Sequence, residues 1–149
     1  MMRAIWGISL AMVLAGCQAE VAQTRQALSG QPPVVTGWLL NVWRVADLNG
    51  GGAPPDKVRV VFIGALEGGM LSGNAGCNDM FGQWRDMDGE FKIGPIETKN
   101  KVCNKSVMAI ETQLLSVLQA ANNRIFNSNG TVTLTTPDGR RVTLRPDRP

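Results

Sequence analysis

Hydrophobic and polar positions alternate along much of the chain in a pattern that predicts short strands. Residues 38–45 (WLLNVWRV) are apolar and rich in residues that favour strands, and a glycine- and proline-rich loop follows at 49–55. Residues 58–63 place apolar side chains at every second position. Because the other face of that segment is only partly polar, we expect a central strand or one in a closed sheet.

The middle of the chain predicts further strands around a stretch rich in glycine. A short strand is expected at 70–72, followed by the glycine-dense residues 73–82. Trp84 and residues 91–93 then indicate the two strands of a hairpin, with residues 86–89 as its turn.

One helix and a closing hairpin complete the pattern. Asn104 or Ser106 is suited to cap the start of the helix, and Asn122–Asn123 to end it. Apolar residues recur at helical spacing at Val107, Ile110, Leu114, Val117 and Leu118. Clean alternation at 131–135 and 141–145, on either side of a Pro-Asp-Gly turn, predicts the hairpin. The order of elements indicates an α+β fold with mostly antiparallel strands.

The first residues carry the features of an export signal. Arg3 precedes an apolar run from 4 to 14, which is too short to span a bilayer, and Leu14-Ala15-Gly16-Cys17 resembles the bacterial lipobox. This predicts a lipoprotein signal peptide at 1–16, a lipidated Cys17 with a flexible tether at 17–36, and a globular domain at 37–149. The alternative is an ordinary secreted protein cleaved near Ala15 or Ala19. By the usual sorting rule, Gln18 in place of aspartate favours the outer membrane, with the domain facing the periplasm.

Composition excludes several kinds of chemistry. The chain contains no histidine, which rules out Ser–His and Cys–His nucleophiles and zinc sites with histidine ligands. We expect no cofactor and no metal, because Asp86–Glu90 lacks the remaining ligands of a calcium loop and is better explained as a solvated turn. The formal charge of +3 falls to +2 without Arg3. Lys99, Lys101 and Lys105 are the nearest approach to a basic cluster, so we expect no nucleic-acid partner.

The three cysteines allow one disulfide. If Cys17 carries lipid, Cys77 and Cys103 remain as a possible pair in an oxidising compartment. Such a bridge would close a loop of about 27 residues, worth about 3.5 kcal/mol in the chain-entropy model. Two buried free thiols or one reactive thiol are the alternatives.

Two motifs carry a resemblance to a known family. Gly73-Asn74-Ala75-Gly76-Cys77-Asn78, with Gly82 and Trp84 after it, resembles the signature of the META domain family, whose HslJ-like members are bacterial envelope lipoproteins. Residues 93–98, ending at Thr98 and followed by Cys103, resemble the second motif of that family, and the likeness covers about 38–146. Met80 stands where the family usually has an aromatic residue. Thr98 lies five residues before Cys103, where four are expected.

The resemblance implies a barrel-like antiparallel sheet with one packed helix, and roles in heat shock, envelope stress or drug tolerance without an agreed enzymatic activity. From the residues themselves, we expect Gly73 and Gly76 to permit unusual backbone geometry, and Asn78 to bond its own backbone in a tight turn. We expect Glu111 to accept hydrogen bonds from amides of the glycine loop.

These observations predict a non-catalytic envelope protein, attached to the membrane through lipid on Cys17, that binds or shields an unidentified envelope protein or ligand. One alternative is a thiol-dependent redox protein or enzyme that uses Cys77 or Cys103. Another is a structural accessory of an envelope complex.

Overall fold

The computed structural model describes residues 42–147, apart from residues 56 and 66. They belong to one compact unit, Thr36–Pro149. The predicted signal peptide (1–16), the tether (17–36) and the first part of the strand expected at 38–45 lie outside the described residues.

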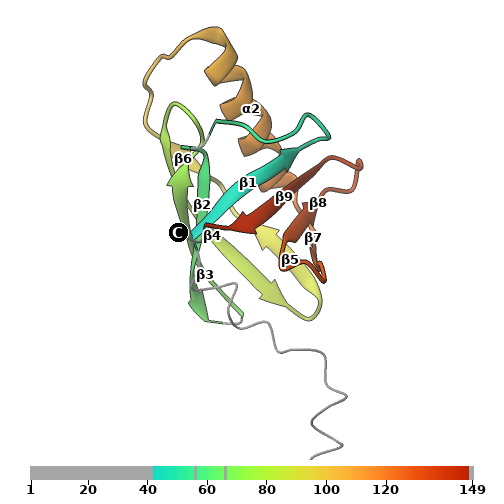
Figure 1. Ribbon diagram of the computed structural model, residues 1–149. Helices are drawn as coiled ribbons and strands as arrows, with labels where there is room; N and C mark the ends of the chain where they lie inside the picture. Colours follow the sequence, from blue (N-terminus) through green and yellow to red (C-terminus); the bar gives the residue numbers. More distant parts are fainter. Residues whose placement is uncertain (1–41, 56, 66, 148–149) are drawn as a thin grey trace, which may run out of the picture. The chain divides into compact units, whose positions relative to one another are not determined.

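The described chain forms nine strands and one helix, labelled in Figure 1. In chain order these are β1 (Val42–Leu48), β2 (Arg59–Ala65), β3 (Gly68–Asn74), β4 (Asp79–Met87), β5 (Glu90–Ile93), β6 (Glu97–Thr98), α2 (Lys105–Ala120), β7 (Asn123–Phe126), β8 (Val132–Thr135) and β9 (Arg141–Pro146). The sheet order is β5-β4-β3-β2-β1-β9-β8-β7, with β6 paired to β4, and all the pairings are antiparallel.

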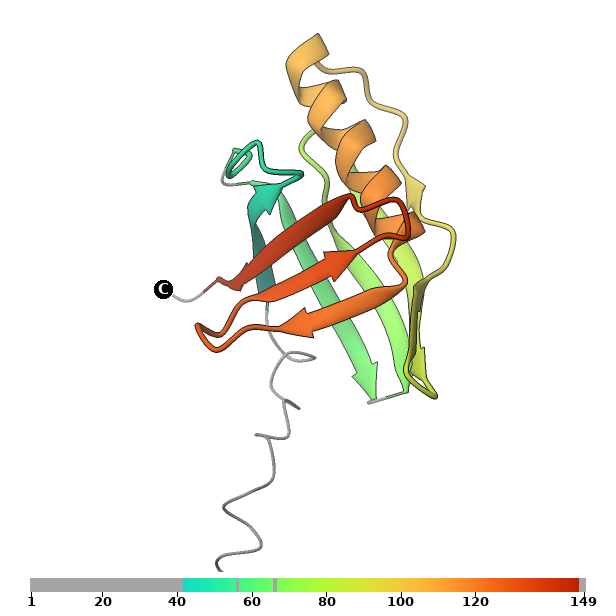
Figure 2. The same cartoon turned by 90° about the vertical axis from the view of Figure 1, so that its right-hand side faces the viewer.

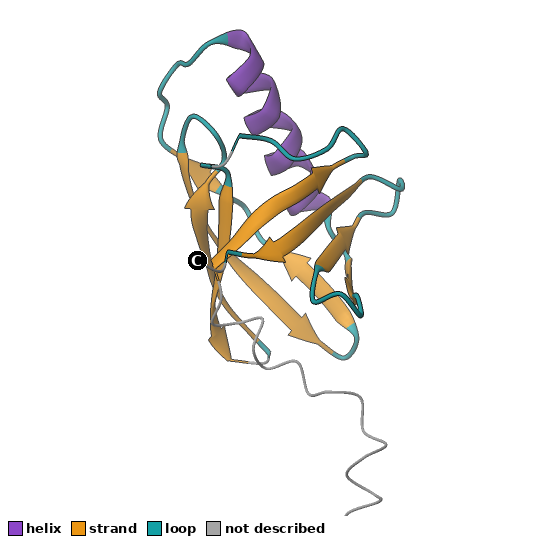
Figure 3. Ribbon diagram, viewed as in Figure 1, coloured by secondary structure: helices purple, strands orange, loops and turns teal. Residues whose placement is uncertain are grey.

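The sheet curls so that its two ends, β5 and β7, lie against each other (Figures 1 and 2). The helix α2 contacts β5 and β9 and lies across one end of the curled sheet, as the colouring by secondary structure makes plain in Figure 3. The result is a nearly closed, barrel-like antiparallel sheet with one packed helix. This confirms the predicted fold class.

The core fills the inside of the curled sheet because inward side chains alternate with outward ones along each strand. A bulge between Val45 and Asp47 shifts the register of β1 against β9, and Leu48 is thereby buried. The most completely buried large side chains of the core are Trp84, Phe62, Phe91, Leu71, Met80, Leu114, Leu118, Leu134 and Leu144. Phe62 meets Trp84 edge to face, with 5.9 Å between the ring centroids, which is a favourable aromatic geometry.

The helix begins where the sequence predicts and ends slightly earlier. Asn104 caps it, and its Oδ1 accepts a hydrogen bond of 3.0 Å from the backbone N–H of Val107. The expected end at Asn122–Asn123 is wrong, because the cap is Ala121 and the N–H of Asn122 donates to the carbonyl of Thr135. The chain therefore passes directly from the helix into the sheet.

Several strand limits differ from the expectation. β3 runs over seven residues, not three, because glycines at both of its ends pair in the ladder. β4 continues through Met87, so Asp86 belongs to a strand and not to the turn. The short strands β6 and β7 were not predicted. The two residues of β6 are too few to show a periodicity, and β7 is mostly exposed and so lacks alternating burial. The closing hairpin lies where its alternation indicates.

Candidate functional site

The glycine motif forms the turn between β3 and β4. The N–H of Ala75 donates to the carbonyl of Asn78 at 2.9 Å, which closes the turn. Gly76 has φ +123°, a conformation that a side chain disfavours. At Gly73 the constraint is space, since a Cβ would stand 2.0 Å from the carbonyl oxygen of Arg59.

Asn78 lies at the centre of this region and is 2% exposed. Its Oδ1 accepts from the backbone N–H of Lys101 at 2.9 Å, and its Nδ2 donates to the carbonyl of Lys101 at 3.1 Å. The same Nδ2 donates to Oε1 of Glu111 at 2.8 Å. A primary amide has two donor hydrogens, so both are used, and the side chain joins the turn to the segment before the helix.

The expectation that Asn78 bonds its own backbone is wrong. That role belongs to Asn74, whose Oδ1 accepts from the N–H of Gly76 at 2.9 Å. The side chain of Asn78 is instead turned into the protein, where Lys101 and Glu111 provide the partners that a buried amide requires.

Glu111 is a buried carboxylate on the inner face of α2, 4% exposed. Its Oε2 accepts from the backbone N–H of Asn78 at 2.7 Å, so both oxygens bond to one residue of the turn. Hydrogen bonds to a charged acceptor are stronger than neutral ones, which compensates for burying the carboxylate.

A disulfide between Cys77 and Cys103 lies beside these hydrogen bonds, with 5.9 Å between the two Cα atoms. The bridge confirms the pairing that the cysteine count favours and differs from both free-thiol alternatives. Asn78, Glu111, the backbone of Lys101 and the disulfide together are called the Asn78 cluster below. The cluster joins the glycine turn, the segment before α2, and α2 itself.

Residues 99–105, called the lysine tip below, project next to the cluster. Every one of them except Cys103 is exposed, and Val102 is 91% exposed. Lys99 pairs with Asp79 at 3.2 Å. The hydrogen bond from Asn74, together with Lys99, lowers the pKa of the Asp79 carboxyl below its ordinary value.

The remaining motif residues have places in the strands. Gly82 faces inward, where a Cβ would lie 3.1 Å from the carbonyl oxygen of Pro95, so the small residue lets the chain before β6 cross close to β4. Thr98 pairs with Met80 in the β4–β6 ladder. The extra residue between Thr98 and Cys103 lies in the exposed segment that leads into the helix.

A second polar contact, which the sequence did not indicate, lies where the sheet nearly closes. Arg124 of β7 pairs with Asp86 of β4 at 2.6 Å, and the Asp86 side chain is 7% exposed. The guanidinium carbon of Arg124 also lies 5.9 Å from the ring centroid of Phe91 and 5.7 Å from that of Phe126. Burial raises the pKa of the Asp86 carboxyl, and Arg124 opposes that shift. The solvated turn expected at Asp86 is therefore wrong, because this carboxylate is buried and paired.

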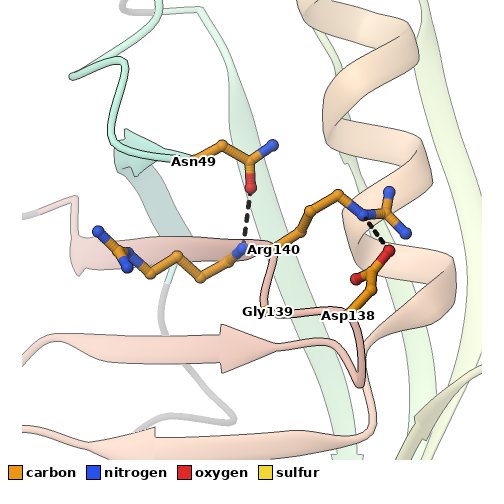
Figure 4. A pocket seen from close by; sticks show the side chains of 5 residues that line it. Asn49, Asp138, Gly139 and Arg140 are labelled. Atoms are coloured by element: carbon orange, nitrogen blue, oxygen red, sulfur yellow. Dashed lines mark hydrogen bonds and ion pairs between the residues drawn. The ribbon is translucent and has the colours of Figure 1, made fainter.

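A pocket opens between the turn after β1 and the β8–β9 turn, lined by Asn49, Asp138, Gly139, Arg140 and Arg141 (Figure 4). The Oδ1 of Asn49 accepts from the N–H of Arg141 at 2.8 Å, and Arg140 pairs with Asp138 at 2.8 Å. Hydrogen bonds from Thr136 and Arg140 lower the pKa of Asp138. The Asn49–Arg141 bond joins the two turns, and Thr136 and Arg140 of the β8–β9 turn engage the carboxylate of Asp138.

The described part of the chain offers neither a candidate metal site nor a candidate membrane span. No group of three or more histidine, cysteine, aspartate or glutamate side chains could hold a metal ion there. The helix found in that part does not meet the length and hydropathy needed to cross a membrane.

The architecture is that of a small barrel-like α+β domain with a disulfide beside its helix. The META domain family model matches residues 37–149, about three quarters of the chain, and the chain belongs to that family. Comparison with curated proteins gave no match.

Two structures solved by NMR are similar. One shares 19% identity over 73% of this chain and 91% of its own, with a TM-score of 0.57. The other, from Burkholderia xenovorans, shares 18% identity over 75% of this chain and 81% of its own, with a TM-score of 0.52. At these identities the likeness concerns the fold alone.

Proposed function

We propose that this protein is a lipid-anchored bacterial envelope protein whose META domain binds or shields a partner at the membrane, without catalysis of its own, and so supports tolerance of envelope stress or drugs. The observation that carries the proposal is the Leu14-Ala15-Gly16-Cys17 sequence, at the end of an apolar run and upstream of the matched domain.

The geometry of the Asn78 cluster supports a scaffolding role for the motif residues. Asn78 and Glu111 are buried and bonded to each other, and the two cysteines are joined, so these groups hold the turn and helix in place. The chain has no histidine, so a serine or cysteine nucleophile would lack the usual base.

The first test is the intact mass of the protein purified from membranes, before and after reduction and thiol alkylation. We expect a mass that starts at Cys17 and includes acyl chains, with Cys77 and Cys103 alkylated only after reduction. A Cys17→Ser variant is the matched control and should lose the acyl mass while keeping the disulfide. An unlipidated wild-type protein with thiols that are alkylated before reduction would overturn the proposal.

A second test addresses the physiological role. In the source bacterium with the gene deleted, we expect sensitivity to envelope stress that the wild-type gene reverses and the Cys17→Ser gene does not. Full complementation by the soluble variant would contradict the need for an anchor.

A further inference from the structure

The lysine tip is the most exposed apolar and cationic feature among the described residues. Val102, at 91%, is the most exposed of their large hydrophobic side chains, well above Met70 at 58% and Ile63 at 53%. Three of the five lysines of the chain, Lys99, Lys101 and Lys105, lie within seven residues around it. An exposed apolar side chain with lysines close to it in the sequence is a composition that favours an anionic lipid surface.

The charge of the tip is only partly compensated. Asp79 pairs with Lys99, whereas neither Lys101 nor Lys105 forms an ion pair with any other described residue. The first turn of α2 contains no acidic residue, and a lysine at that end of a helix is unfavourable for the helix itself. Helix stability therefore does not account for Lys105.

The fold holds this tip in position despite its exposure. Asn78 bonds both the N–H and the carbonyl of Lys101, and the disulfide fixes Cys103 directly after Val102. A segment already held in its binding conformation loses less conformational entropy when it docks. The buried polar Asn78 cluster thus holds an exposed loop in one position.

We propose that the lysine tip is a membrane-docking surface that places Val102 among the headgroups of an anionic phospholipid bilayer and Lys101 and Lys105 against their phosphates. The proposal rests on the lipid anchor of the proposed function for its proximity to a membrane. Twenty-four residues lie between Cys17 and Val42. They can span at most about 85 Å, whereas a domain of this size has a radius of gyration of about 13 Å. The anchor therefore permits several faces of the domain to reach the bilayer, and the tip selects one.

The test attaches residues 17–149 to vesicles through a histidine tag in place of the lipid, on nickel-chelating lipids, so that it does not depend on lipidation at Cys17. This chain contains the whole matched domain and every described contact. Acetylation of each lysine by an amine reagent is followed by mass spectrometry on vesicles of phosphatidylcholine alone and on vesicles with an equal share of phosphatidylglycerol. Lys92, which is exposed on β5, serves as the internal control.

We expect Lys101 and Lys105 to be acetylated about fivefold more slowly on the anionic vesicles, with Lys92 unchanged and the protection lost at high salt. Val102→Ser should reduce the protection, and Ile63→Ser, at another exposed apolar position, should not. Equal rates on both vesicle types, equal protection of Lys92 and the two tip lysines, or protection by phosphatidylcholine alone would overturn the docking surface. Because the tag supplies the anchor, such a failure leaves the mass test of Cys17 unaffected, and the two proposals fail separately.

Discussion

The Asn78 cluster and the Arg124–Asp86 contact perform the same task by different means. Each joins segments that are distant in sequence through a buried polar contact. The cluster uses a disulfide and hydrogen bonds to backbone groups, all within the glycine turn, the helix and the segment between them. The Arg124–Asp86 contact uses an ion pair and two aromatic rings where the ends of the sheet meet. The cluster fixes a local shape, whereas the ion pair helps to close the barrel.

Among the changes at these two contacts, removal of the disulfide is expected to lower the free energy of unfolding the most. Cys77→Ser/Cys103→Ser should lower the free energy of unfolding by about 3.5 kcal/mol, because the unfolded chain regains the freedom of a long loop. Urea unfolding measures the change, and reduced wild-type protein should behave alike. Cys17→Ser is the control with no expected effect, and a loss as large in that variant would contradict the assignment.

Asn78→Ala is expected to cost nearly as much, about 3 kcal/mol, since it leaves Oε1 of the buried Glu111 and both backbone groups of Lys101 without their side-chain partner. Glu111→Gln retains one acceptor oxygen but turns its amide NH2 toward the other N–H donor of Asn78, so it should cost about 2 kcal/mol. The matched control is Asn100→Ala, at an exposed position of the tip. If Asn78→Ala unfolds at the same urea concentration as Asn100→Ala, the cluster is not a source of stability.

Much of the Asn78 cluster could be predicted from the sequence, and the Arg124–Asp86 contact could not. If Cys17 carries lipid, the two remaining cysteines leave a single pairing, and Asn104 precedes a clear helical period. For Asn78 the residue was identified but its partner was not, because a buried asparagine and a turn asparagine have the same local sequence. Arg124 lies in a short, mostly exposed strand without alternation, and its partner Asp86 is 38 positions away.

Arg124→Met should cost less than loss of the disulfide or Asn78→Ala, about 2 kcal/mol, because it leaves the carboxylate of Asp86 buried without a counter-ion while Arg124 itself is partly exposed. Replacing both partners, as Asp86→Leu/Arg124→Met, should recover most of that loss. Arg85→Met, at an exposed arginine of β4, controls for lost charge. A double variant no more stable than Arg124→Met alone would show that the contact does not act as a pair.

The smallest expected effect is a dependence on pH at the same contact. Burial raises the pKa of Asp86 in the folded protein above its ordinary value of 3.8. Between the ordinary pKa of the unfolded chain and the raised pKa of the folded protein, the folded state binds more protons than the unfolded state. The free energy of unfolding should therefore fall as the pH rises between these two pKa values. The pKa values of Asp79 and Asp138 shift in the opposite direction. Both residues are also present in an Asp86→Asn variant, so their contribution cancels when that variant is compared with the wild type.

The measurement is the difference in unfolding free energy between wild type and Asp86→Asn from about pH 3.5 to 6. Wild type should lose stability relative to the variant as the pH rises. A relative gain would mean that Arg124 outweighs burial at this carboxylate.

Hydrogen exchange at the backbone amides of Asn78 and Lys101 tests the central claim most directly, that the buried cluster holds an exposed tip rigid. Both amides donate to side chains of the cluster, at 2.7 Å and 2.9 Å. We predict that in the oxidised protein they exchange as slowly as amides in the ladder between β8 and β9, and that reduction of the disulfide accelerates them selectively. Exchange of Lys101 as fast as that of an unprotected loop amide in the oxidised protein would contradict the account.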